Sequence, residues 1–340
     1  MILDGQLPAS IAAAARALRG GALLGLPTET VYGLAADASS DAAVAQIFAA
    51  KGRPSDHPLI VHVADATGIV HFASSVPDFA QKLVDAFWPG PLTLILPRRP
   101  GVATAATGGQ DSVGLRCPAH PVAHALLVAC AALGDSALLG GPPVHGVAAP
   151  SANRFGRVSP TTAAHVQSEL GADLLVLDGG ACAVGIESTI VDCTRGAPVL
   201  LRPGAITRAQ IEAACGTRLL SKEELSAHAP RASGTLLAHY APNAPVRLMD
   251  AAALQAGLDA RGADAPLLAV YARTPLRSQS PRAVLQAMPA DATATAAQLF
   301  ATLRDFDAQG ARQIWIETPP DTPDWEGVRD RLQRAAAAAV

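Results

Sequence analysis

The stretch LPTETVYGLAAD (residues 26–37) joins an apolar run to a cluster of hydrogen-bonding side chains. The run before it, ALLGLP (22–27), is short and apolar, which is typical of a buried strand. Open α/β sheets bind their ligands beyond the carboxyl ends of their strands. We therefore expect an α/β fold with a ligand site at this edge, although composition alone favours an ordinary polar turn. The polar residues of the cluster are Thr28, Glu29, Thr30 and Tyr32.

Helical and strand patterns alternate on both sides of this stretch. Residues 10–21 (SIAAAARALRGG) predict a helix that two glycines end, and residues 40–52 predict a helix that Ser40 or Asp41 caps. This alternation, with its short links, predicts a mixed sheet with helices around it. Further helices are predicted over 76–90 and 120–134, and further strands over 59–63, 92–97, 113–118, 172–180 and 188–194.

The pattern changes near residue 207. One more helix is predicted over 206–216, and the polar, proline-rich residues 221–245 are typical of a connector. A second, smaller α/β pattern follows, with strands predicted over 246–250, 266–272 and 313–318 and helices between them. We therefore predict three parts: a first domain over 1–207, a linker over 208–244 and a small C-terminal α/β domain over 245–340.

Composition limits the class of protein. The chain has 340 residues, of which 50% are hydrophobic and 16% charged, and its net charge is −3. Such a balance gives no global attraction to nucleic acid or to a membrane surface, so any anion site must be local. Arg16 and Arg19 interrupt the first apolar segment, which is unlike a signal peptide, and no uncharged run is long enough to span a membrane. We expect a cytoplasmic protein.

Cysteines and histidines give little sign of a metal site. The five cysteines are scattered without a CxxC pair, which favours buried thiols over disulfides or zinc. His120 and His124 are four apart and could share a helix face as metal ligands, but no HExxH pattern or nearby acidic ligand supports them. A pair of histidines at a helix start is the favoured interpretation.

Cations and hydroxyls gather in four further places. Lys51 and Arg53 stand where Pro54 ends the helix predicted over 40–52, and alone they are best explained as a cationic helix end. An arginine in an apolar strand is costly without an anionic partner, which singles out Arg116 and Arg202. The loop APSANRFGRVSPT (149–161) adds hydroxyls, an amide and guanidinium groups suited to phosphate or ribose.

Several standard sites are missing from the sequence. It has no GxxxxGK[ST] loop, no GxGxxG and no GxSxG elbow. Any nucleotide is therefore held by other means than a P-loop or a dinucleotide fold. The polar inventory favours electrostatic handling of a polyphosphate over covalent catalysis.

Six motifs, taken in order, resemble the YrdC-like family: PTETVYGL, KGRPSDHPLIVHV, VGLRCP, APSANRFGRVSPT, GIESTIVD and LLRPGAI. The resemblance covers about residues 10–207. HYAP (239–242) in the linker and LRDFDAQG and DRLQRAA in the tail extend it to the long, two-domain form of threonylcarbamoyl-AMP synthase. The resemblance implies an open twisted mixed sheet around a basic cavity, plus a Rossmann-like C-terminal domain.

The resemblance also implies a reaction. Enzymes of this kind, which are nucleotidyltransferases, combine L-threonine, bicarbonate or CO2 and ATP, with Mg²⁺, into threonylcarbamoyl-AMP and pyrophosphate. A partner transferase then modifies adenosine 37 of tRNAs that read ANN codons. A zinc-bearing hydrogenase-maturation protein shares the module but would need cysteine pairs. The non-enzyme alternative is an RNA-binding module without ATP turnover, which the acidic charge balance disfavours.

Site residues are carried over from matching motif positions. Lys51 and Arg53 are implied to act electrostatically in catalysis, and no protein ligand of the metal is implied with certainty. The implied ATP-binding residues are Lys51, Arg53, His57, Ser112, Ser151, Asn153, Ser159, Arg202 and Tyr240. The implied threonine-binding residues are Thr30, His62, Arg116, Ala149 and Ser188, with Arg116 assigned to the threonine carboxylate because its fork fits that group.

The linker departs from the family pattern. Tyr240 is expected to reach back to the nucleotide and make the linker a lid that excludes water, an interpretation favoured over an ordinary linker aromatic. Leu237 and Ala238 stand where basic residues are expected, which puts a linker contact to phosphate in doubt. The Gly/Pro-rich residues 139–148 are also longer than usual, which would loosen the cavity wall.

Overall fold

The computed structural model describes residues 1–133, 139–224 and 230–338. Contacts between residues divide the chain into two compact units, each described by itself below. The first consists of residues 1–155 and 159–235, and the second of 156–158 and 236–340. The linker predicted over 208–244 is thus shared between the units, and the second unit also takes in a short segment from the 149–161 loop.

One mixed sheet organises the first unit. Eleven strands of its described residues follow the order β1-β8-β2-β3-β7-β4-β6-β5-β9-β10-β11. Some neighbouring strands are parallel, such as β4 and β6, and others are antiparallel, such as β5 and β6, so the sheet is mixed as predicted. The strands are β1 (Ile2–Asp4), β2 (Leu24–Leu26), β3 (Gly33–Asp37), β4 (Ile60–His62), β5 (Leu92–Pro97), β6 (Ser112–Arg116), β7 (Val147–Ala148), β8 (Leu175–Asp178), β9 (Thr189–Asp192), β10 (Val199–Arg202) and β11 (Leu220–Ser221).

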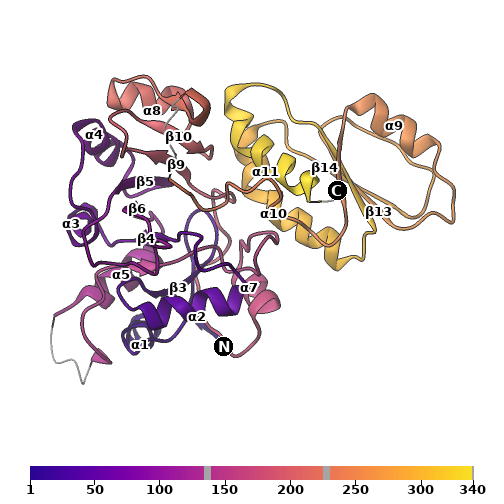
Figure 1. Cartoon of the computed structure of the whole chain (residues 1–340). Helices are drawn as coiled ribbons and strands as arrows, with labels where there is room; N and C mark the ends of the chain where they lie inside the picture. The colour runs from indigo at the N-terminus through magenta and orange to yellow at the C-terminus, as the bar shows by residue number, and fades with distance from the viewer. Residues whose placement is uncertain (134–138, 225–229, 339–340) are drawn as a thin grey trace. The chain divides into compact units, whose positions relative to one another are not determined.

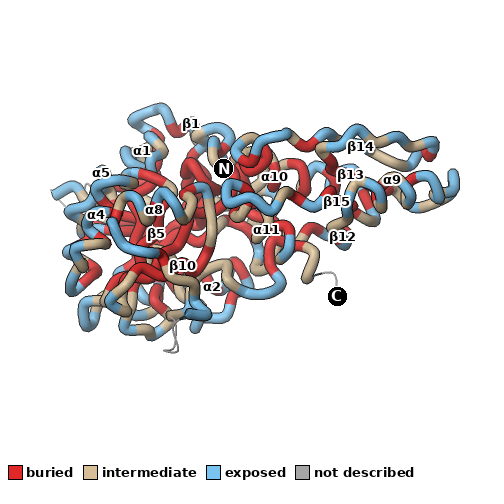
Figure 2. The backbone as a smooth tube through the Cα atoms, turned by 90° about the horizontal axis from the view of Figure 1, so that it is seen from above, coloured by how far each residue is buried: buried red, intermediate tan, exposed pale blue. Residues whose placement is uncertain are grey.

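Helices flank this sheet in two groups. Helices α1 and α5 pack on each other, and α4 packs on α8 (Figure 1). One apolar cluster contains residues of α1 and α5, and another contains residues of α4 and α8. Buried residues accordingly concentrate in the middle of the unit (Figure 2). The helices are α1 (Pro8–Arg19), α2 (Asp41–Lys51), η1 (Ala66–Gly68), α3 (Ile69–Phe72), α4 (Asp78–Phe87), α5 (Pro121–Ala131), α7 (Ala163–Leu170), α8 (Arg208–Cys215) and η2 (Lys222–Glu224).

Helix α2 shows how local sequence delivers a functional residue. The Ser40 hydroxyl accepts a hydrogen bond from the Ala43 amide at 3.2 Å and begins the helix, which confirms Ser40 as its cap. Gly52 ends it with φ 61°, a left-handed conformation that glycine adopts at little cost. Lys51 is therefore the last helical residue, and the chain turns sharply before Arg53.

The second unit has its own small parallel sheet. Its four strands have the order β12-β15-β13-β14, and every pair is parallel. This agrees with the predicted small α/β domain. Its elements are β12 (Val246–Met249), α9 (Ala251–Asp259), β13 (Leu268–Ala272), β14 (Ala283–Ala287), α10 (Ala292–Ala308), β15 (Gln313–Glu317), η3 (Pro323–Trp325) and α11 (Glu326–Ala337).

The cysteine and histidine predictions hold for the first unit. All five cysteines are free and buried. His120 is the N-cap of α5, where its Nδ1 accepts from the Val122 amide, while the Nδ1 of His124 lies 3.1 Å from the Ala64 carbonyl oxygen. Among the described residues no group of three or more His, Cys, Asp or Glu could hold a metal ion. Nor does any described helix have both the length and the apolar character needed to span a membrane.

Candidate functional site

Strands β4 and β6 bring two predicted threonine-binding residues side by side. Their parallel register pairs His62 with Arg116, each the last residue of its strand. Both side chains are buried, with exposed fractions of 3% and 4%. Ligands in open α/β sheets bind at such carboxyl ends, so the register itself builds a site there.

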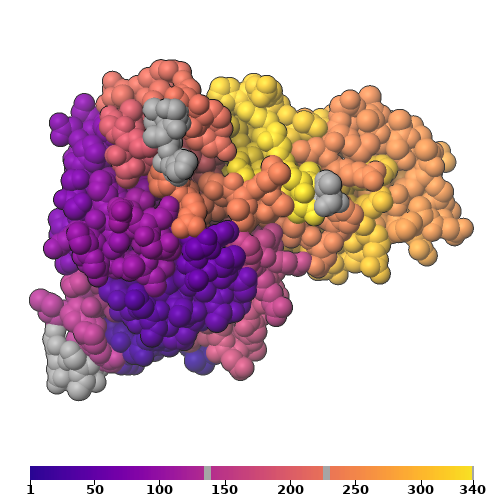
Figure 3. All heavy atoms as spheres, in the orientation of Figure 1, coloured from indigo at the N-terminus to yellow at the C-terminus, as the bar shows by residue number. Residues whose placement is uncertain are grey.

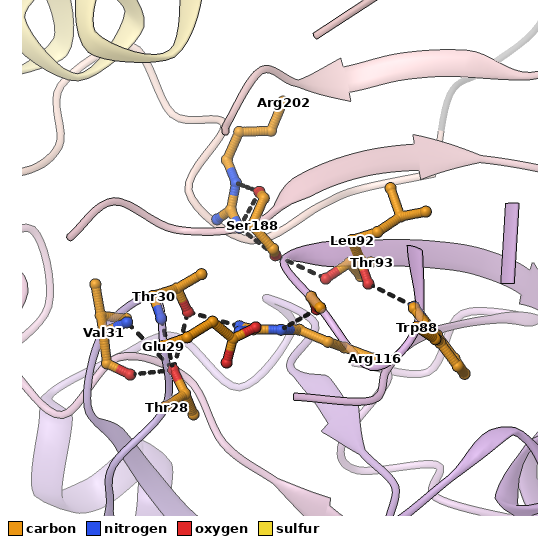
Figure 4. Close-up of polar contacts among 11 residues, drawn as sticks. Thr28, Glu29, Thr30, Val31, Trp88, Leu92, Thr93, Arg116, Ser188 and Arg202 are labelled. Atoms are coloured by element: carbon orange, nitrogen blue, oxygen red, sulfur yellow. Dashed lines mark hydrogen bonds and ion pairs between the residues drawn. The ribbon is translucent and has the colours of Figure 1, made fainter. Parts of the chain in front are cut away.

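The Arg116 guanidinium lies inside a ring of polar partners. Its Nη1 donates to Thr30 Oγ1 at 2.7 Å, its Nε donates to the Gly90 carbonyl at 3.3 Å, and its Nη2 lies 2.7 Å from Glu29 Oε1. Figure 4 shows Glu29 and Thr30 on the loop after β2, facing the arginine. The costly buried arginine inferred from the sequence thus has an anionic partner, and Glu29 was not among the predicted site residues.

Thr28 organises the loop that carries Thr30. Its hydroxyl accepts hydrogen bonds from the amides of Thr30 and Val31 and lies 2.9 Å from Thr30 Oγ1. Tyr32 fixes the far end, since its amide donates to the Pro160 carbonyl and its hydroxyl to the Gly180 carbonyl at 2.8 Å. The loop is therefore rigidly placed beside Arg116.

His62 is held in its neutral form. Burial, and secondly the Arg116 charge, lower the pKa of His62 from 6.5 to about 3. Its Nδ1 lies 3.3 Å from the Ile60 carbonyl oxygen, which suits a proton on that nitrogen. A neutral imidazole with that tautomer can accept a hydrogen bond at Nε2 without adding positive charge beside Arg116.

Ala149 lies where β3 and the 149–161 loop approach each other. Its amide donates to the Ile60 carbonyl at 3.1 Å. A Cβ built on Gly33 would meet the Ala149 methyl at 3.0 Å, so glycine permits this close approach. Ala149 thus lies next to β4, which ends at His62.

Ser188 connects the threonine residues to the predicted nucleotide residues. Its hydroxyl lies 2.7 Å from Thr93 Oγ1, and Arg202 donates to it at 3.1 Å from Nη2. The Nε and Nη2 of Arg202 also donate to the Ser188 carbonyl at 3.0 and 2.8 Å (Figure 4). Arg202 therefore holds the chain just before β9 and places Ser188.

Lys51 fixes the backbone of the 149–161 loop. Its buried ammonium donates to the carbonyl oxygens of Ser151 and Asn153. Burial, and secondly the nearby Arg53 charge, hold the pKa of Lys51 well below its usual range. A nearby anion would favour the charged form of this lysine.

Arg53 lies between the start of β4 and the linker. Its Nη2 donates to the Pro58 carbonyl at 2.9 Å and to the Ser233 hydroxyl at 3.0 Å, and its guanidinium stacks over the Phe155 ring at 5.7 Å. The half-buried His57 ring meets the edge of the same phenylalanine, with ring centroids 5.5 Å apart. Burial, and then the Arg53 charge, lower the pKa of His57.

Residues 230–235 of the linker also lie in this region, on the surface of the first unit (Figure 3). The Ser233 carbonyl accepts from Arg202 Nη1 at 2.9 Å, so one linker residue holds both Arg53 and Arg202. Arg231 pairs with Asp56 at 2.6 Å. Segment 231–233 and the predicted ATP residue Ser112 line one pocket over β4, β5 and β6.

The remaining predicted ATP residues fall into two places. Ser159 is fully buried and donates to the buried carboxylate of Glu187, a contact that the sequence did not suggest. Tyr240 belongs to the second unit, where it is buried, stacks on Phe300 and lies under the Arg331 guanidinium. Its expected reach to the nucleotide stays a prediction, as do the consequences of Leu237 and Ala238.

The predicted site residues of the first unit lie at both ends of β4 and β6: His62 and Arg116 end these strands, whereas Ser112 begins β6 and Arg53 contacts the segment just before β4. The structure adds Glu29, Thr28 and Ser233 to them. Burial marks out Glu29, since acidic residues are rarely buried without a partner. In the sequence Glu29 was one member of the polar cluster over residues 28–32, and nothing there indicated that it is buried beside Arg116. Chemically, these residues offer a guanidinium with a carboxylate beside it, a neutral imidazole, and a group of cations and hydroxyls.

Two family models and several known proteins match this chain. Residues 16–204 match the family model described as "Telomere recombination", and residues 206–337 match that described as "Threonylcarbamoyl-AMP synthase, C-terminal domain". The chain is 38% identical to the threonylcarbamoyl-AMP synthase of Bacillus subtilis, over 97% of this chain and 94% of the relative. It is 42% identical to that of Pyrococcus abyssi, over 70% and 67%.

A solved relative shares the whole architecture. The crystal structure of P. abyssi Sua5 complexed with L-threonine matches with a TM-score of 0.84 and 34% identity, over 97% of this chain and 94% of that one. Both units, and not the large sheet alone, are therefore shared with it. From these matches and the two family models, the chain belongs to the threonylcarbamoyl-AMP synthase family, in its long two-domain form.

Proposed function

We propose that this chain is a nucleotidyltransferase that converts L-threonine, bicarbonate or CO2 and ATP into threonylcarbamoyl-AMP and pyrophosphate. The observation that carries the proposal is that Arg116, with Thr30 and Glu29 around it, lies in the same unit as Arg202, which holds Ser188 and together with Arg53 contacts Ser233. An enzyme that joins an amino acid to a nucleotide needs groups for both substrates close together.

The threonine end needs a carboxylate partner and a neutral acceptor. The planar guanidinium of Arg116 can take a carboxylate in two parallel hydrogen bonds. His62 stays neutral at ordinary pH, because its pKa lies near 3, and can accept from the substrate's amine or hydroxyl. The ammonium first loses a proton, and the free amine then adds to CO2 and releases a second proton to form a carbamate, which leaves the amino acid with a second anionic group.

The nucleotide end must overcome repulsion between anions. A carbamate oxygen attacks the α-phosphorus and pyrophosphate leaves, so two negative groups have to approach within bonding distance. Arg53, Arg202 and Lys51 supply positive charge in a largely desolvated region, where each interaction is stronger than in water. In the described structure Arg53 and Arg202 instead hold Ser233, so we expect triphosphate to displace this linker contact.

Magnesium enters, in this proposal, as the MgATP substrate complex. The described residues offer no cluster of three acidic or histidine ligands, and Mg²⁺ commonly binds through substrate phosphates with few protein ligands. We therefore assign the ion to phosphate oxygens. The product, a hydrolysable mixed anhydride, would pass to a transferase that acts on tRNA.

Pyrophosphate release from the full-length protein tests the proposal. It should require ATP, L-threonine and bicarbonate together, and mass spectrometry should find the threonylcarbamoyl adenylate. Arg53→Ala and Lys51→Ala should lower kcat/KM by about 100-fold or more, as expected for electrostatic residues. Exposed Arg312 offers a matched control, and Arg312→Ala should leave the rate unchanged.

Two results would contradict the proposal. Pyrophosphate release that ignores threonine would show a different reaction. Salt-sensitive tRNA binding without ATP turnover would favour the RNA-binding alternative. A further result would concern the residues and not the reaction. If Lys51→Ala and Arg53→Ala lost activity only in proportion to their loss of thermal stability, these residues would have a purely structural role at the helix end.

A further inference from the structure

The inference concerns Glu29, a buried acidic residue that no predicted role includes. Its exposed fraction is 9%, and the side chains of the Glu29–Arg116 pair are 11% and 5% exposed. Among the described residues the carboxylate has one polar neighbour, Arg116 Nη2, at 2.7 Å from Oε1. Neither carboxylate oxygen has a hydrogen-bond partner in ordinary geometry.

Such a carboxylate is costly unless something else completes its environment. A buried ionised carboxylate usually has several hydrogen-bond donors, and each missing one adds to the desolvation penalty. If Glu29 served only to pair with Arg116, we would expect the protein itself to supply these hydrogen-bond donors. The missing donors therefore point to a ligand that brings its own N–H groups to Glu29.

Charge identifies the ligand class. Glu29 and Arg116 together carry no net charge, and His62 beside them is uncharged. A zwitterion binds such a pair without leaving a net charge, because its carboxylate takes Arg116 and its ammonium takes Glu29. A plain anion would instead leave Glu29 beside a second carboxylate, which low-dielectric surroundings make unfavourable.

We propose that Glu29 is a substrate-binding residue that accepts the α-ammonium group of the amino acid, so that Glu29 and Arg116 together select a zwitterion. The arriving carboxylate takes over Nη2 of Arg116, and the ammonium gives Glu29 the cation it then lacks. In the absence of substrate the same two side chains neutralise each other. This inference rests on the proposed function, since it concerns the residues proposed there to bind the amino acid.

Binding of two ligands that differ only at the amine tests the assignment. Isothermal titration calorimetry would compare L-threonine with 2,3-dihydroxybutanoate of matching stereochemistry, in which a hydroxyl replaces the amine. In Glu29→Gln the Kd for threonine should rise about 10- to 100-fold, the usual effect of losing one charge-assisted hydrogen bond. The Kd for the deaminated analogue should stay within about twofold or fall, because the repelling charge is gone.

Two further variants separate charge from shape. Glu29→Asp keeps the charge but shortens the side chain, so it should bind threonine better than Glu29→Gln does. Glu212→Gln is the matched control: Glu212 is a half-buried carboxylate on α8 that accepts from the Leu219 amide at 2.9 Å. It should change neither Kd. If Glu29→Gln does not fold, Glu29→Asp should still raise the threonine Kd at least about threefold and leave the analogue's unchanged.

The outcomes distinguish this inference from the proposed function. Equal weakening of both ligands in Glu29→Gln would mean that Glu29 only orients Arg116, and the inference would be wrong. An unchanged threonine Kd would overturn it as well. Both failures leave threonine-dependent pyrophosphate release by the wild-type protein intact, whereas loss of that activity in the wild type contradicts the proposed function itself.

Discussion

Two of the arginine–glutamate pairs among the described residues lie at strand ends, and they differ in one respect. In the first unit Arg116 ends β6 and pairs with Glu29, and in the second unit Glu317 ends β15 and pairs with Arg273. The nearest nitrogen–oxygen distance is 2.7 Å in both. What differs is the number of donors that each carboxylate has around it.

The pair of the second unit is complete without any ligand. Glu317 accepts from the backbone amides of Arg273 and Thr274 at 2.7 and 2.8 Å, and the Thr274 hydroxyl lies 3.1 Å from Oε1. The Arg273 guanidinium also stacks over Trp325 at 5.3 Å. Burial alone would raise the pKa of Glu317, but these hydrogen bonds and the Arg273 charge hold it below its usual range.

In the pair of the first unit, the carboxylate lacks hydrogen-bond donors. Glu29 has the guanidinium of Arg116 and no hydrogen-bond donor in ordinary geometry among the described residues. The contrast teaches that burial and ion pairing do not by themselves identify a binding site. The unfilled hydrogen-bonding capacity does, because a structural pair is satisfied by its own chain.

Replacing Arg116 should impair the use of threonine, whereas replacing Arg273 should affect only stability. The largest effect is expected at Arg116. Arg116→Met should lower kcat/KM for threonine by about 1,000-fold, because a two-point carboxylate contact is lost and Glu29 is left unpaired. Arg116→Lys should recover only part of it, since a lysine cannot form the planar fork. Pyrophosphate release at varied threonine concentration measures both.

Arg273→Met provides the control for this prediction. It should lower the melting temperature without changing the threonine KM. If Arg273→Met impaired threonine use as much as Arg116→Met did, the distinction between a ligand-binding pair and a structural pair would be wrong.

Glu317→Gln should affect stability and little else. The amide keeps the shape but loses the charge that Arg273 and two backbone amides contact, so we expect a loss of about 2 kcal/mol in the free energy of unfolding. Because the folded-state pKa of Glu317 is lowered, this contribution is present at neutral pH and disappears as the solution is acidified. Urea denaturation at pH 7 and at pH 4 would measure it. A similar loss for the variant at both pH values would contradict the assigned ion pair.

The sequence predicted the large outlines of this fold because its buried strands are apolar and separated by glycine and proline. Strand β14 was missed, and its residues are half-buried or exposed at the edge of the second sheet, so they carry no apolar run. Strands β3 and β7 were also missed. They consist mostly of alanine, glycine and valine, of which alanine and glycine are poor strand formers.

Site residues were predictable where the residue type was unusual for its place. Arg116 and Arg202 were singled out because arginines rarely end apolar strands, and both are buried at the site. Glu29 looked like an ordinary turn residue, since its burial depends on strands distant in sequence. Ser233 could not be predicted for the same reason: the sequence of the linker does not show that Arg53 and Arg202 meet it.

The last prediction concerns His62, and it tests whether the imidazole beside the Glu29–Arg116 pair is neutral in the folded protein. The folded protein holds the pKa of His62 near 3, whereas the unfolded chain has the ordinary value of 6.5, so below pH 6.5 only the unfolded state binds this proton. The resulting loss of stability is absent above pH 6.5 and grows on acidification by up to about 1.4 kcal/mol per pH unit. His62→Gln should flatten that slope in urea titrations between pH 7 and pH 5. His71→Gln should flatten it less, because His71 is only partly buried. If His62→Gln left the slope unchanged, His62 would be protonated in the folded state and would add positive charge beside Arg116, and the pair would then favour an anion over a zwitterion.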